Sequence, residues 1–323
     1  MSGEILLESG TNELEVLEFY LGDQSYGINV AKVLQVEQFE PKLVTKTPES
    51  QNSEILGVYL WRNETLPIMD LAAVLEREPD TSIHRPLVLV TEFFGEKTAF
   101  KIDGVNRIYR VGWEEMKPIS SFLGKYSSRT NGTLNVQLST DADDKREIEI
   151  LMLDFESIVA EYIPEDIGWT KGLEQKKAKD EKAFNRADVK VVLAEDSAFL
   201  RNMLKDALTR AGYTSLSVFK NGKLAFDYVE KIVTDAKEKK ISIPSILNLI
   251  ISDIEMPLMD GLTFCKKVKK DMGINVPVVF FSSLINEQMK IKCNDVGGDA
   301  QVTKPSMKNL ITLLDELCQK KMK

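Results

Sequence analysis

The sequence predicts a protein of two domains, in which an all-β domain is followed by an α/β domain built on a parallel sheet. The chain of 323 residues is long enough for two domains of ordinary size. Its first half contains two similar strand–turn–strand patterns, whereas its second half alternates short apolar runs with helical segments. Residues 164–187 are polar and rich in Lys and Glu, which is typical of a partly helical or flexible linker. We therefore expect domains at 13–163 and 188–320.

Two predicted β-hairpins define the first domain. Each joins two apolar strands by a turn that contains glycine: Leu14–Leu21 with Tyr26–Val30, and Pro86–Phe94 with Thr98–Ile102. Because the two hairpins share one design and lie far apart in the chain, they favour two small barrels over one large sheet.

The second domain is expected to form a parallel sheet that is covered on both faces by helices. A helix over Ala198–Ala211 is predicted to stop at Gly212, and Lys308–Cys318 is predicted to close the chain as a helix. The first helix places a set of apolar residues on one face: Phe199, Met203, Leu204, Ala207 and Leu208. Four short apolar runs are predicted as buried strands: Val189–Ala194, Leu247–Ile251, Pro277–Phe281 and Ala300–Val302.

Composition excludes several classes of function. A net charge of −8, from 42 basic and 50 acidic residues, speaks against nucleic-acid binding. Cys265, Cys293 and Cys318 have no spacing typical of a disulfide framework or a zinc site. The single histidine, His84, excludes most histidine-based catalysis and metal clusters. No signal peptide and no apolar run near ~18 residues is visible, so we expect a cytoplasmic protein without direct membrane insertion.

Polar residues follow the predicted strands at the ends where ligands bind in parallel sheets. These residues are Glu195 and Asp196 after the first strand, then Asp253, Ser282 and Lys304 after later ones. One such Asp is more often a helix cap, but five polar residues at matching positions indicate a site. Three neighbouring carboxylates repel unless a cation joins them, and oxygen ligands favour Mg²⁺. The hydroxyl and the ammonium then suit an anion beside the metal, such as a phosphoryl group on a carboxylate.

The same residues resemble the response-regulator receiver family of the CheY type, which has a flavodoxin-like fold, over residues 188–320. The motifs are Glu195-Asp196, Asp253-Ile-Glu-Met-Pro-Leu-Met-Asp-Gly261, Phe281-Ser282-Ser283 and Lys304-Pro305. This resemblance implies that Asp253 accepts a phosphoryl group from a histidine kinase and that Ser282 and Lys304 contact its oxygens. It also implies Mg²⁺ held by Glu195, Asp196, Asp253 and the main-chain carbonyl of Glu255, and a cis peptide at Lys304-Pro305. Gln301 departs from the family, in which an aromatic commonly occupies this switch position.

The first half resembles the CheW adaptor family, a pair of small five-stranded barrels, over residues 13–163. The motifs are Phe19-Tyr-Leu-Gly-Asp23, Tyr26-Gly-Ile28, Lys32-Val33, Gly57, Arg62, Leu66-Pro-Ile-Met-Asp-Leu71 and Phe100-Lys-Ile-Asp-Gly-Val105. Arg62, at an expected hairpin tip, is either a solvated turn residue or an interface arginine. Trp61 is either an interface anchor or barrel packing. The family usually has a carboxylate near this arginine, and Gln35 takes its position here, with Glu37 close by.

An adaptor followed by a receiver resembles the CheV family of chemotaxis coupling proteins. The resemblance implies a non-enzymatic scaffold that links methyl-accepting chemoreceptors to the histidine kinase CheA at membrane-associated arrays. Phosphorylation at Asp253 would regulate that coupling. The alternative is a phosphate sink, in which a passive adaptor localises the receiver beside CheA. A transcriptional regulator and a phosphohydrolase fit less well, because the chain is acidic and Glu255 replaces the second Asp such a hydrolase needs.

Overall fold

The computed structural model describes residues 13–48, 53–78, 85–119, 129–139, 145–162, 185–283 and 287–321. The chain separates into two compact units, of which one spans Leu14–Tyr162 and the other contains residues 185–321. His84 and most of the expected linker lie outside the described residues. Arg186, near the end of the expected linker, already belongs to the second unit, since its guanidinium pairs with Asp315 at 2.5 Å.

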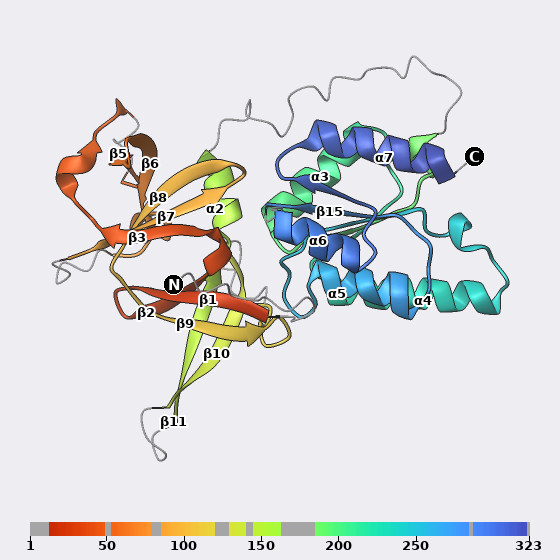
Figure 1. The fold of residues 1–323 in the computed structure, drawn as a ribbon, viewed down its shortest axis with the longest axis horizontal. Coiled ribbons are helices and arrows are strands. Elements are labelled where there is room, and N and C mark those ends of the chain that lie inside the picture. Colours follow the sequence, from red (N-terminus) through yellow and green to blue (C-terminus); the bar gives the residue numbers. More distant parts are fainter. Residues whose placement is uncertain are drawn as a thin grey trace. The chain divides into compact units, whose positions relative to one another are not determined.

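The first unit consists of two sheets with few helices (Figure 1). One sheet has the strand order β10-β11-β2-β1-β9 and the other has the order β3-β7-β8-β6-β5-β4. The second sheet has six strands where five were expected, because the two-residue strand β4 adds to its edge. The strands are β1 Glu13–Leu21, β2 Gln24–Asn29, β3 Val33–Gln38, β4 Val44–Thr45, β5 Ile55–Trp61, β6 Glu64–Asp70, β7 Leu87–Phe93, β8 Glu96–Ile102, β9 Gly104–Gly112, β10 Thr130–Ser139 and β11 Lys145–Leu153. The helices are α1 Leu71–Val74 and α2 Phe155–Tyr162, with short 3-10 turns η1 Val30–Lys32 and η2 Pro41–Leu43.

Both hairpins predicted from the sequence are confirmed. Strands β1 and β2 pair antiparallel up to Leu21 opposite Gln24, and β7 and β8 pair up to Phe93 opposite Glu96. Each hairpin therefore closes through a two-residue loop. Gly22 and Gly95 have φ values of +60° and +77° in these loops, a conformation that glycine adopts without steric cost.

An aromatic cluster joins the two sheets of the first unit. The ring of Phe155, on α2, lies 6.1 Å from Phe19 of one sheet, 5.9 Å from Phe93 and 5.1 Å from Phe100 of the other. All four side chains are buried. Aromatic pairs at these distances add to the stabilisation from apolar burial. Helix α2 thus packs both sheets into one unit.

The second unit is a five-stranded, all-parallel sheet with the strand order β13-β12-β14-β15-β16. Its strands are β12 Val191–Ala194, β13 Leu216–Phe219, β14 Leu249–Ser252, β15 Val278–Ser282 and β16 Ala300–Thr303. Its helices are α3 Ala198–Arg210, α4 Gly222–Glu238, α5 Gly261–Lys266, the π-helical turn η7 Lys267–Asp271, α6 Glu287–Asp295 and α7 Met307–Lys321, with 3-10 turns η5 Arg186–Asp188 and η6 Ile243–Ser245. The predicted parallel α/β sheet is confirmed, with β13 as an additional edge strand.

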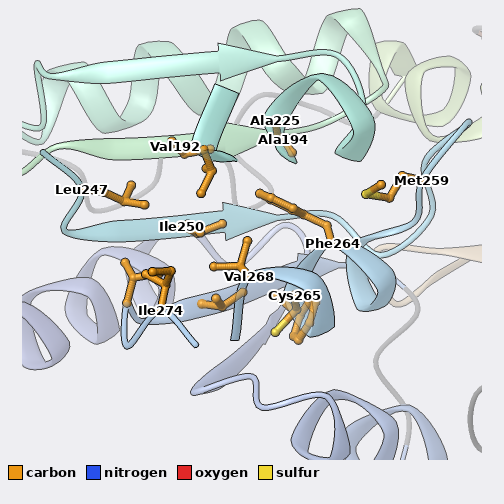
Figure 2. Packing of buried hydrophobic residues seen from close by; sticks show 14 of the residues in the cluster. Val192, Ala194, Ala225, Leu247, Ile250, Met259, Phe264, Cys265, Val268 and Ile274 are labelled. Carbon is orange, nitrogen blue, oxygen red and sulfur yellow. The ribbon is translucent and has the colours of Figure 1, made fainter. Parts of the chain in front are cut away.

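The apolar core of the second unit lies on both faces of its sheet. Figure 2 shows one face, where Phe264 and Val268 from α5 and η7 lie beside Ile250 of the central strand β14. Every residue of β12, β14 and β15 is buried, as expected for strands covered on two sides. The inward face of α3 differs in part from the prediction, because Leu200 is buried whereas Phe199 and Met203 are only half-buried.

Candidate functional site

The carboxyl ends of four parallel strands bring the predicted polar residues to one edge of the sheet. Glu195 and Asp196 follow β12, and Asp253 follows the adjacent strand β14. Ser282 ends β15, and Lys304 follows β16. The main-chain N–H of Lys304 donates to the carbonyl of Ser282 at 3.2 Å, so these two residues are neighbours. The parallel register thus assembles residues that are up to about a hundred positions apart in sequence.

Lys304 connects two of the acidic residues. Its Nζ atom donates to Asp253 Oδ2 at 2.7 Å and lies 3.0 Å from Glu195 Oε2. Lys304 and Glu195 are each 1% exposed and Asp253 is 3% exposed. These ion pairs are therefore shielded from water, where charge–charge interactions are stronger than at a surface.

Glu195, Asp196 and Asp253 form what we call the carboxylate cluster. Each offers one oxygen, and the three oxygens lie within 4.8 Å of one another. With all three ionised, the ammonium of Lys304 leaves two negative charges in a largely buried site. Buried charge without compensation is costly, and an all-oxygen donor set suits a hard divalent cation. The chemistry of these donors therefore fits Mg²⁺.

The backbone around Asp253 holds its side chain in place. Oδ1 accepts the N–H of Ile254 at 2.6 Å, while Oδ2 accepts from Lys304, so both carboxylate oxygens are oriented. Gly261, which begins α5, lies against this segment: a Cβ atom there would be 2.0 Å from the Asp253 carbonyl oxygen. Only glycine therefore allows this close approach. The predicted cis peptide at Lys304-Pro305 is present.

The sequence also pointed to Glu255, Ser282 and Gln301, and the structure gives the surroundings of each. Glu255 is half-buried in the loop after Asp253, and Ser282 is fully buried. Gln301 lies on β16, where its Nε2 donates to the carbonyl of Lys290 at 3.2 Å and to Asn294 Oδ1 at 3.1 Å. At the position of the family's switch aromatic, this chain therefore has an amide that bonds helix α6.

One residue beside the cluster was not found from the sequence. Arg201, on α3, donates from Nη1 to the carbonyls of Glu195 and Asp196, both at 2.9 Å. Its position five residues after Asp196, inside a predicted helix, is the signal that could have suggested a cation beside the acidic pair.

The first unit carries the other predicted site residues on the hairpin of β5 and β6. Trp61 and Glu64 are opposite each other, and Arg62 and Asn63 form the turn with φ values of 47° and 67°. The predicted hairpin tip is thus confirmed. Exposed Arg62 stacks on the ring of Trp61 at 4.8 Å from its centroid.

Beneath Arg62, Trp61 is only 5% exposed and packs with the core of its sheet, including Tyr59. Glu37, the possible carboxylate partner of the arginine, instead accepts from Gln35 at 2.8 Å and from the Tyr59 hydroxyl at 3.0 Å. Burial and the bond to Glu37 raise the pKa of Tyr59 above its ordinary value. The partner that the structure gives Arg62 is therefore the aromatic ring.

Comparison with known proteins assigns both units. The CheW-like domain family matches residues 15–161, and the response regulator receiver domain family matches residues 191–315. The chain is a CheW-like domain followed by a receiver domain. Both resemblances stated from the sequence are thereby confirmed.

Relatives that align with more than nine-tenths of this chain are named as chemotaxis proteins. The chain is 29% identical to the chemotaxis protein CheV3 of Helicobacter pylori over 304 residues, which cover 91% of each protein. It is 24% identical to CheV1 of the same organism, over 93% of this chain and 91% of that protein. The scaffolding protein TtCheW of Thermoanaerobacter tengcongensis is a solved structure with 19% identity and a TM-score of 0.36, covering 44% of this chain and 84% of its own.

The CheV relatives and the two domains support a chemotaxis coupling protein. Within the described ranges, no helix combines the length and the apolar character that crossing a bilayer requires.

Proposed function

We propose that this protein couples chemoreceptors to the histidine kinase CheA and that phosphorylation of Asp253 regulates the coupling. The observation that carries the proposal is the buried Lys304, which lies 2.7 Å from Asp253 and 3.0 Å from Glu195, with Asp196 in the same cluster. A buried ammonium among three carboxylates has little value for stability, because apolar residues pack as well at lower desolvation cost. The arrangement suits an anion that arrives on Asp253.

In the proposed step, a carboxylate oxygen of Asp253 forms a bond to phosphorus as the bond from phosphorus to the kinase histidine nitrogen breaks. The histidine nitrogen leaves with the electron pair of that bond. Lys304 is already within hydrogen-bond distance of Asp253, so it is placed to donate to a phosphoryl oxygen. Ser282, which ends the neighbouring strand β15, would supply a second donor. The carboxylate cluster and the main-chain carbonyl of Glu255 would hold Mg²⁺, which would neutralise charge on the phosphoryl oxygens. Beyond accepting this phosphoryl group and losing it again, the chain would catalyse no reaction.

The CheW-like domain is proposed to bind CheA and the cytoplasmic tips of methyl-accepting chemoreceptors, so that the protein acts in the cytoplasm at receptor arrays. Arg62 is the proposed contact residue, because it is exposed, arginine is enriched at interface hot spots, and its stacking on Trp61 limits its conformations. Trp61 would act by holding Arg62 in place. Phosphorylation adds about −1.5 to −2 charges to the receiver, enough to reorganise loops around the site.

The test is a binding titration of the full chain with the CheA regulatory domain and a receptor tip. Each titration is run with and without Mg²⁺ and beryllofluoride, which stands in for the phosphoryl group on Asp253. We expect an affinity change in the wild type that is absent in Asp253→Asn. Arg62→Ala is expected to weaken binding under both conditions. An affinity that beryllofluoride leaves unchanged would favour the alternative, a phosphate sink on a passive adaptor.

A further inference from the structure

A cation next to the carboxylate cluster bonds the main chain of two of its members. Arg201, the fourth residue of α3, donates from one nitrogen, Nη1, to two successive carbonyls, those of Glu195 and Asp196. Both distances are 2.9 Å, and both bonds end on main-chain oxygens. One guanidinium therefore bonds two successive peptide units after β12, the one between Glu195 and Asp196 and the one between Asp196 and Ser197.

The short segment between β12 and α3 is held from several sides. The N–H of Glu195 donates to the carbonyl of Phe219 on β13 at 3.1 Å. Asp196 Oδ1 accepts the N–H of Ser197 at 3.0 Å, and the hydroxyl of Ser197 caps α3 by accepting from Leu200. These bonds fix the two ends of the segment. Arg201 acts between them, on the carbonyls of Glu195 and Asp196.

Holding this peptide matters because the carboxylates repel one another. A rotation of the peptide unit between Glu195 and Asp196 would relieve that repulsion by turning the two side chains apart. Bonds from outside a metal site commonly orient the ligands in this way, and their loss costs affinity for the metal. A charged donor forms stronger bonds to carbonyls than a neutral one, so arginine suits the task.

We propose that Arg201 is a positioning residue that keeps the carboxylates of Glu195 and Asp196 preorganised, with Asp253, for a divalent cation. This inference rests on the proposed function, since it requires that Mg²⁺ binds at the carboxylate cluster. Arg201 acts through the main chain and not as a ligand.

The test measures Mg²⁺ binding to the full chain by isothermal titration calorimetry. Arg201→Met keeps most of the apolar stem of the side chain and removes its donors. We expect the dissociation constant for Mg²⁺ to rise by about 10-fold or more in this variant, as is typical for loss of an outer bond at a metal site. Lys205→Ala is the matched control, because it removes an exposed positive charge one turn further along α3. Its dissociation constant is expected to change by less than about 2-fold, since exposed charges are screened by salt.

A second readout separates positioning from general damage. Phosphorylation by acetyl phosphate is followed at increasing Mg²⁺ concentration. For Arg201→Met, the Mg²⁺ concentration that gives half the maximal rate is expected to rise as the dissociation constant does, while the rate at saturating Mg²⁺ stays near that of the wild type. Circular dichroism verifies folding. If Arg201→Met fails to fold, Arg201→Gln, whose shorter amide does not span both carbonyls, is titrated with the same expectation.

An unchanged Mg²⁺ affinity in the folded variant would overturn the role of Arg201. That result is distinguishable from failure of the proposed function. The metal site and the inference about Arg201 both fail if the wild type binds no Mg²⁺, or if Asp253→Asn does not abolish the binding.

Discussion

The two units bury charge in opposite ways. In the CheW-like domain, Glu18 is 1% exposed, and its carboxylate accepts from three neutral donors: Ser25 at 2.7 Å, Asn106 at 2.8 Å and Tyr109 at 3.0 Å. The bonds connect β1, β2 and β9. Burial and this contact with Glu18 raise the pKa of Tyr109 to about 12, so its hydroxyl remains a donor to a higher pH than that of an ordinary tyrosine. Glu18 is therefore satisfied within the fold.

The receiver instead places three acids at one edge of its sheet. Two of them, Glu195 and Asp253, are buried and share the ammonium of Lys304. This difference indicates which domain responds to a ligand. A carboxylate that is satisfied by fixed neutral donors stabilises the fold and gains nothing from a ligand. A cluster with excess negative charge is stabilised further when a cation binds, and this makes its stability depend on a ligand. Substitutions in the two units should therefore have different sizes and even different signs.

The largest effect is expected for Lys304→Met without Mg²⁺. The change leaves Glu195 and Asp253 buried without their ammonium, and breaking a buried ion pair in this way costs about 3–5 kcal/mol of unfolding free energy. Saturating Mg²⁺ should restore part of the loss, because the remaining carboxylates attract the cation more strongly. The measurement is urea unfolding of the full chain, with hydrogen exchange in receiver peptides to assign the transition.

The control for this variant is Lys101→Met in the CheW-like domain. Lys101 pairs with Asp70 at 2.9 Å, but the two side chains are 28% and 16% exposed. A partly solvated pair contributes about 1 kcal/mol or less. Equal losses of unfolding free energy in the two lysine variants would mean that burial does not make the ion pairs of Lys304 stronger than an exposed pair. The proposed difference between the two units would then be wrong.

An intermediate effect is expected from a matched pair of neutralising substitutions. Glu18→Gln turns an acceptor into an amide whose N–H₂ must face one of three donors, which leaves a buried group unsatisfied at a cost of about 1–3 kcal/mol. Asp253→Asn likewise turns an N–H₂ towards one of its donors, Ile254 or Lys304, but it also removes one of three repelling charges. We expect the second effect to be larger and to stabilise the receiver by about 1 kcal/mol, since functional sites are commonly built at the expense of stability. The free energies of unfolding of both variants are measured without Mg²⁺. Destabilisation of the receiver by Asp253→Asn would contradict the idea that its cluster carries excess charge.

Much of the fold and of the receiver site was predictable from the sequence, because strong local patterns specify them. Both hairpins follow from apolar strands around glycine turns, and the acidic cluster follows from the register of parallel strands. Strand β13 was not predicted, because Leu216–Phe219 is short and half-buried at the sheet edge and carries no continuous apolar run. The burial of Leu200 in place of Phe199 depends on the rotation of α3 about its axis, which is set by packing.

Contacts between distant side chains were the least predictable. Glu37 was a possible partner for Arg62, yet it bonds Gln35 and Tyr59, since its neighbours across the strands decide its partners. Likewise, the sequence shows that Gln301 replaces an aromatic, but not that its amide reaches α6.

The smallest effect on stability is expected for Gln301→Ala. This variant compares an exposed polar contact of the receiver with the buried ion pairs of Lys304 in the same domain. The amide of Gln301 donates to the carbonyl of Lys290 and to Asn294, so two solvent-exposed hydrogen bonds connect β16 to α6. Losing them should cost about 0.5 kcal/mol, at the low end for hydrogen bonds because both are exposed to water. Unlike Lys304→Met, this variant should leave Mg²⁺ binding unchanged and increase hydrogen exchange mainly in α6. An increase spread equally over the whole receiver would mean that Gln301 supports the fold in general and not this helix. An increase confined to α6 would mean that the amide of Gln301, which stands where the family has an aromatic, holds this helix on β16.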